Sequence, residues 1–146
     1  CAKVSVSMGV DLHVLHFVVD GAWFGVVGVE LVMELVPLRR PELGPAVAVL
    51  HYWVDLVVEL PLVVAVTATG ALLLADRSLD ARLLVKLLGA AVALGANLVC
   101  VVLVVWRHRG RADAIEERSR WVRATGIGIP GGLVALYLGL GYAGWL

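Results

Sequence analysis

Residues 44–75 read GPAVAVLHYWVDLVVELPLVVAVTATGALLLA, and this stretch decides the fold class. It is apolar over most of its length and exceeds the roughly 20 residues that a helix needs to cross a bilayer. It nevertheless carries His51, Asp55 and Glu59 at intervals of four residues, which places them on one face of a helix. An ionisable group at the centre of a membrane helix costs about 2.5–3.5 kcal/mol on insertion scales. The stretch therefore predicts a membrane helix whose polar face lies inside a bundle.

The composition of the whole chain supports the same class. Of 146 residues, 61% are hydrophobic and 16% are charged, whereas a soluble domain is nearer to about 45–50% apolar and about 25% charged. The length is enough for four spans and leaves little for a separate soluble domain. We predict an all-α, polytopic integral membrane protein of one domain, with four transmembrane helices in an antiparallel bundle. The zero net charge gives no reason to expect a nucleic-acid partner.

Prolines, glycines and charges set the expected boundaries. Pro37 and Pro41 flank two arginines after the first span, Pro61 is expected to kink the second, and Asp80 is a candidate N-cap for the third. A charged segment, 107–123, is expected to form a cytoplasmic surface helix on anionic lipid headgroups. Glycines and Pro130 within 126–132 are expected to break the chain before the last span. The expected spans are 9–36, 44–75, 81–106 and 127–146.

Lysine and arginine counts predict the orientation. The connections after the first and third spans hold eight of the twelve basic residues, and the opposite side holds four. The basic loops are therefore expected in the cytoplasm and both termini outside, in a bacterial inner membrane. A bundle this small predicts a homo-oligomer or partner membrane subunits. Cys1 is either a native, lipidated or processed end or a foreign residue.

Depth along the helices predicts an inner cluster. At 1.5 Å per residue, Glu30, His51 and Cys100 each lie roughly 10 Å inside the cytoplasmic ends of their spans. Mixed carboxylate and imidazole ligands suit iron, copper, manganese or zinc, and helical bundles build metal sites from such inward side chains. A proton or cation relay and a neutral polar seam between helices are the alternatives. The candidate metal ligands are Glu30, Glu34, His51, Asp55, Glu59 and Cys100, with Asn97 at the same level as a hydrogen-bonding residue.

A second set of polar residues lies near the opposite surface. His13, His16 and Asp20 follow one helical face at spacings of three and four, with Lys86 expected at their level. They predict a metal-capture site or a pocket for haem b. A pair of interfacial histidines, with Asp20 paired to Lys86, is the alternative. Because about 20 Å separates this level from His51, one haem is not expected to bind both His16 and His51.

Short motifs add a resemblance. The segment Leu12-His13-Val14-Leu15-His16, followed by Ala22-Trp23-Phe24-Gly25, resembles the first helix of the copper-resistance membrane permease family and of bacterial membrane protoporphyrinogen oxidases. Thr69-Gly70-Ala71-Leu72-Leu73, Leu84-Val85-Lys86-Leu87-Leu88 and then Asn97 are similar to the middle of those proteins. The resemblance spans about residues 11–100. It implies metal or haem handling at the histidine end, with His16 and Lys86 as the matching positions, whereas the inner acids depart from the pattern.

Three functions follow from these patterns. The leading hypothesis is a transition-metal-binding membrane protein that transports the metal or uses it in redox chemistry. The second is a haem-bearing electron-transfer or oxidoreductase subunit. The third is a non-catalytic accessory subunit of a larger membrane complex. Whether the chain is an enzyme stays open.

Overall fold

The computed structural model describes residues 11–75, 77–110 and 114–142, and the described part is helical apart from short connections. Cys1, the first residues of the first expected span, residues 111–113 of the charged segment and the last four residues of the fourth span lie outside it. The elements follow in the order α1 (Leu12–Arg39), η1 (Pro41–Leu43), α2 (Gly44–Val54), η2 (Asp55–Glu59), α3 (Leu60–Leu74), α4 (Ala81–His108), α5 (Ile115–Ala124), η4 (Thr125–Ile127) and α6 (Gly128–Tyr142).

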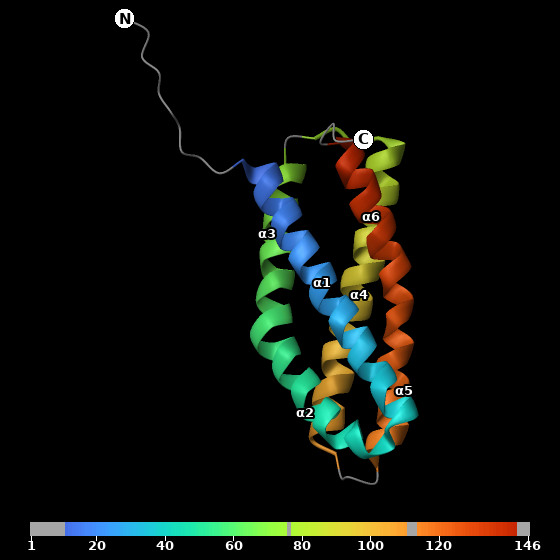
Figure 1. The fold of residues 1–146 in the computed structure, drawn as a ribbon. Helices are drawn as coiled ribbons and strands as arrows, with labels where there is room; N and C mark the ends of the chain where they lie inside the picture. The colour runs from blue at the N-terminus through green and yellow to red at the C-terminus, as the bar shows by residue number, and fades with distance from the viewer. Residues whose placement is uncertain (1–10, 76, 111–113, 143–146) are drawn as a thin grey trace, which may run out of the picture.

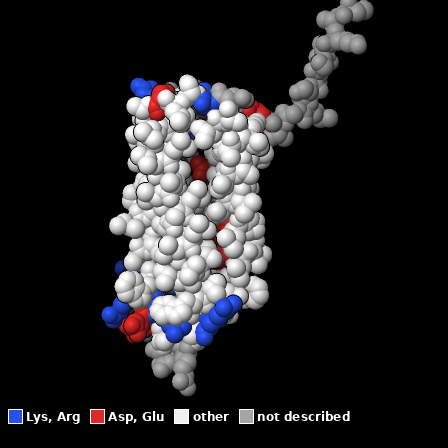
Figure 2. Space-filling model, turned by 180° about the vertical axis from the view of Figure 1, so that it is seen from behind, with Lys and Arg blue, Asp and Glu red and all other residues white. Residues whose placement is uncertain are grey.

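Four helical stretches are long and apolar enough to cross a membrane: Leu12–Arg39, Pro41–Leu74, Ala81–His108 and Ile115–Gly141. In Figure 1 they form one elongated bundle, with α2 and α5 at the end opposite the start of α1. Figure 2 shows charged side chains gathered at the two ends of the bundle. Within the apolar band between them, acidic atoms are visible in this view only in the furrow between two columns of side chains. This distribution is typical of a bundle that meets lipid on its outside and keeps its acids inside.

The N-caps of two long helices are aspartates. Asp11 precedes α1, and its side chain accepts a hydrogen bond from the backbone amide of His13 at 2.9 Å. Asp80 accepts from the amide of Leu83 at 2.7 Å, which confirms the predicted cap of α4. Each carboxylate satisfies an amide that has no partner within its helix.

Prolines and glycines interrupt the helices less than expected. α1 continues through Pro37 to Arg39, because a proline one turn before a helix end removes only one internal hydrogen bond. The break expected at 126–132 is instead the short η4 turn, after which α6 includes Pro130 and its neighbouring glycines. The fourth helical stretch therefore begins near Ile115, within the segment that was expected to lie on the membrane surface.

The second span accommodates Pro61 through a π-helical segment. The amide of Leu60 donates to the carbonyl of Asp55, five residues earlier, so η2 is wider than a regular helical turn. Asp55 and Glu59 bound this segment and both are buried. π-Helical segments within α-helices are frequently found at functional sites.

The helices associate as two close pairs. α4 lies along α6 and α1 lies along α3, while α2 with α4, and α1 with α5, join the pairs at the end shared by α2 and α5. Glycine permits the first pairing, because a Cβ atom added to Gly89 would lie 2.6 Å from the carbonyl oxygen of Gly131 on α6. Between the pairs, a small core contains Trp23 of α1, Val63 and Val66 of α3, and Ala93 of α4.

The close α4–α6 contact predicts a position-specific effect of a single methyl group. Gly89→Ala should lower stability by about 1–3 kcal/mol, because the added carbon overlaps the α6 backbone. Gly95→Ala is the matched control on the same helix, since nothing lies within 4 Å of its added Cβ. Thermal unfolding in detergent measures both variants. Equal melting temperatures for the two would contradict this packing.

Candidate functional site

Five ionisable side chains meet in the interior of the bundle, and we call them the acidic cluster: Glu30, Glu34, His51, Asp55 and Glu59. All five are buried, with exposed fractions of 1–5%. α1 supplies the first two, and α2 with η2 supplies the other three, each set at the four-residue spacing of one helical face. The structure thus brings together the residues that helical spacing and depth placed at one level.

Arg107 is a member of this site that the sequence analysis missed. It was assigned to the surface segment 107–123, but α4 extends to His108 and the arginine side chain is only 1% exposed. Its Nη1 donates to Glu34 Oε1 at 2.7 Å and to Ser119 Oγ of α5 at 3.1 Å. The sequence does contain a pattern that indicates an inward position for Arg107. Asn97, Cys100 and Arg107 are spaced three and seven residues apart and share one face of α4.

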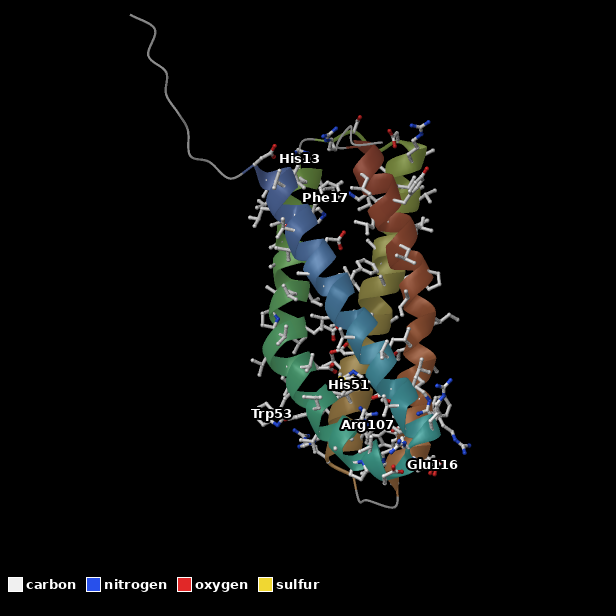
Figure 3. All side chains as sticks on the ribbon, viewed as in Figure 1. His13, Phe17, His51, Trp53, Arg107 and Glu116 are labelled. Atoms are coloured by element: carbon white, nitrogen blue, oxygen red, sulfur yellow. The ribbon has the colours of Figure 1, made fainter. Side chains whose placement is uncertain are left out.

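The arginine and the histidine meet at the same carboxylate. His51 Nδ1 lies 2.6 Å from Glu34 Oε1, and Arg107 Nη2 lies 3.1 Å from that nitrogen. Because Glu34 Oε1 already accepts from Arg107, this oxygen is an acceptor toward His51 as well. The proton between them therefore belongs to Nδ1 of the imidazole. In Figure 3 His51 and Arg107 lie at neighbouring levels, far from His13 at the opposite end.

The second ring nitrogen of His51 faces carboxylates. Nε2 lies 3.2 Å from Asp55 Oδ1 and 3.8 Å from Glu30 Oε2. On the other side of Asp55, Glu59 Oε1 accepts from the indole of Trp23 at 3.2 Å and from Asn97 Nδ2 at 2.5 Å. The Asn97 contact confirms the predicted hydrogen bond between helices. The second oxygen of Glu59 is left uncommitted.

Several buried carboxylate oxygens accept no hydrogen bond from the described residues. These atoms are Glu30 Oε1, Glu34 Oε2, both carboxylate oxygens of Asp55 and Glu59 Oε2. Leaving such groups without a partner in an apolar interior is costly. One ligand atom from each of Glu30, Asp55 and Glu59 lies within 4.8 Å of the others, and the same holds for His51, Asp55 and Cys100. The two groups share Asp55, so the arrangement has the donor atoms and spacing of a cation site.

The polar residues near the His13 end are more loosely arranged. His13, His16, Asp20 and Lys86 all line one cavity of about 410 Å³. However, the described residues whose ligand atoms lie within 4.8 Å of one another do not include His13, His16 or Asp20. The side chain of His13 is 40% exposed and lies 3.4 Å from Asp11. The expected three-residue ligand set is therefore not assembled in this structure.

Among the residues at the His13 end, His16 is held by a second hydrogen bond of the kind that a metal-ligating histidine usually makes. Thr69 Oγ1 lies 2.8 Å from His16 Nδ1 and donates its own proton to the carbonyl of Ala65 at 2.8 Å. The hydroxyl oxygen therefore accepts from Nδ1–H, and Nε2 keeps a free lone pair. Such a second hydrogen bond fixes the orientation of a metal-bound imidazole.

No family model, curated protein or solved structure matches this chain. The resemblance to copper-resistance permeases and membrane protoporphyrinogen oxidases stays a prediction.

The buried ion pair predicts a large effect of removing one charge. Arg107→Met leaves the Glu34 carboxylate buried without its cation, which should cost about 3–5 kcal/mol. Arg120→Met is the control, because that side chain is 73% exposed and makes a long, exposed ion pair of 3.8 Å with Glu116 of the same helix. Denaturant unfolding in detergent compares the two, and equal midpoints would show that the Arg107 pair does not hold the site together.

Proposed function

We propose that this chain is a multi-pass membrane protein that binds one divalent transition-metal ion at the acidic cluster and carries it across the bilayer. The observation that supports this function most strongly is the set of buried carboxylate oxygens without hydrogen-bond donors. Soluble proteins solvate such atoms with water, whereas a membrane interior requires an internal partner.

The charge of the cluster favours a cation over a polar seam. Four carboxylates, those of Glu30, Glu34, Asp55 and Glu59, surround a single buried arginine among the described residues. Arg107 compensates one carboxylate and a protonated His51 would compensate a second, so two remain in excess. A divalent ion lowers this excess and at the same time coordinates the uncommitted oxygens. Protons alone are the rival solution, since a protonated carboxyl of Glu30, Asp55 or Glu59 can donate to an uncommitted oxygen of a neighbour.

The ligands and their supporting residues have distinct roles in this proposal. Glu30, Asp55 and Glu59 offer oxygens, and His51 offers Nε2. Glu34 is not a ligand here, because it holds Nδ1–H of His51 and is itself held by Arg107. This carboxylate–histidine arrangement is the usual outer shell of a metal-bound imidazole. Oxygen and imidazole donors favour Mn²⁺, Fe²⁺ or Zn²⁺, and Cys100 would add a softer donor that suits Zn²⁺ or copper.

The membrane setting is part of the same proposal. The four apolar stretches form an antiparallel bundle in a bacterial inner membrane, with the Arg107 end in the cytoplasm and both termini outside. Its supports are the excess of basic residues at the Arg107 end and the many exposed valines and leucines along the helices. The acidic cluster would then lie in the inner half of the bilayer, and His13 would lie at the outer surface.

The geometry of His16 favours a second candidate function. A free Nε2 beside a cavity of about 410 Å³ is a donor that would bind the iron of haem b in an electron-transfer subunit. A Soret band that disappears in His16→Ala, with His51→Gln unaffected, would support this candidate. A colourless protein would exclude it.

Metal loading tests the leading proposal. Protein purified in detergent, exposed to Mn²⁺, Fe²⁺ or Zn²⁺ and then desalted, should retain one ion per chain by elemental analysis. His51→Gln and Glu59→Gln should abolish retention, because each removes a donor atom. Glu34→Gln should weaken binding about 10–100-fold through loss of the outer shell. Glu42→Gln, whose side chain is 62% exposed, is the control and should bind normally.

Transport is measured separately, as uptake of the retained ion into proteoliposomes. No retained ion in the native chain, or full retention in His51→Gln, would contradict the metal proposal. Retention without uptake would support a metal-binding site and contradict the carrier.

A further inference from the structure

Two cavities lie one after the other along the bundle. The larger one, which we call the vestibule, has a volume of about 410 Å³ and reaches from His13 and Asp80 to Trp23. The smaller one, which we call the inner cavity, has a volume of about 70 Å³ and is lined by Cys100 and by four members of the acidic cluster, Glu30, Glu34, His51 and Glu59. Both are lined by Trp23, Phe24 and Ala93. These three side chains therefore form the wall between the two spaces.

The wall is built from both helix pairs. Trp23 of α1 packs in the core formed with α3 and α4 and is 6% exposed. Phe24 reaches from α1 to α6, where its ring occupies the place that a Cβ atom on Gly132 would need. α1 makes its main contacts with α3 rather than with α4 or α6, so this wall is where α1 reaches the second pair at mid-bundle.

Trp23 is also linked to the acidic cluster. Its indole nitrogen donates to Glu59 Oε1 at 3.2 Å, while Glu59 Oε2 is uncommitted. A cation that binds Glu59 therefore acts on the carboxylate that holds Trp23 in place. Away from Trp23 the inner cavity is not enclosed: Leu31, which is 38% exposed, lines it together with Thr125 and Gly126.

We propose that Trp23 is a gate between the vestibule and the acidic cluster, and that divalent cations reach the cluster from the His13 end only when the indole leaves Glu59. This inference rests on the proposed function for the identity of the ion. The vestibule would receive the hydrated ion, with His13, His16 and Asp20 on its wall. The carboxylates beyond Trp23 would replace its water. The structure corresponds to the state with the gate shut.

Cys100 provides a reporter that needs no metal. It lines the inner cavity, and Cys1→Ser leaves it as the single thiol of the chain. The probe is a small, positively charged methanethiosulfonate reagent, added to proteoliposomes from the His13 side; a thiolate in contact with water attacks its sulfur and releases sulfinate, and the reagent does not enter lipid. Its reaction with Cys100 should be slow in this background. Trp23→Ala should accelerate it at least about tenfold, whereas Trp53→Ala, an exposed tryptophan on α2, should leave the rate unchanged.

A second measurement leaves Trp23 in place and so does not depend on the stability of Trp23→Ala. Cysteine introduced at Ala90, which lines the vestibule but not the inner cavity, should react at least about tenfold faster than Cys100 in the same background. Equal rates at the two positions, or no acceleration in a folded Trp23→Ala variant, would overturn the gate. Because neither rate involves a metal, the gate can fail while metal retention succeeds, and the reverse holds too.

Discussion

The ion pair between Arg107 and Glu34 is the interaction on which the rest of the site depends. It joins α4 to α1 at the end of the bundle where the two helix pairs meet, and Ser119 extends it to α5. By committing Glu34 as an acceptor, the pair also sets the tautomer of His51. The second ring nitrogen of that histidine then faces the carboxylates rather than the arginine. One buried guanidinium thus shapes both the fold and the donor set.

The π-helical segment before Pro61 completes that donor set. Proline cannot donate a backbone hydrogen bond, and the wider turn over Asp55–Glu59 precedes it. The two acids that bound the turn contribute three of the five carboxylate oxygens that accept no hydrogen bond from the described residues. A local backbone irregularity and an excess of buried carboxylate therefore occur at the same place.

Helical periodicity was sufficient to predict four apolar stretches and the meeting of Glu30, His51 and Asp55. Each of those residues lies inside a long apolar run, so its face and depth follow from counting residues. Arg107 escaped the same reasoning because it stands at the start of a charged segment, where a basic residue usually marks a membrane boundary. The Gly126–Gly132 region was expected to break the chain. Its glycines instead allow α6 to approach α4, which depends on the partner helix and not on local sequence.

The predicted ligand set at the His13 end shows where helical periodicity is not sufficient. His13, His16 and Asp20 share a helical face in the sequence, but a common face does not bring side chains onto one point. His16 turns to Thr69 on α3, while His13 stays near Asp11 at the helix start. What the sequence could not supply was the separation of the two helix pairs, which leaves a vestibule between these side chains rather than a compact site.

The central claim is that His51 and the surrounding carboxylates coordinate a metal ion together. The most direct measurement is pulsed electron paramagnetic resonance of the Mn²⁺-loaded protein, which detects nitrogen nuclei bonded to the ion. If the claim holds, the spectrum shows coupling to a single histidine nitrogen, with the remaining ligands oxygen, and this coupling is lost in His51→Gln. Bound Mn²⁺ without any nitrogen coupling, or with coupling that survives His51→Gln, would contradict it.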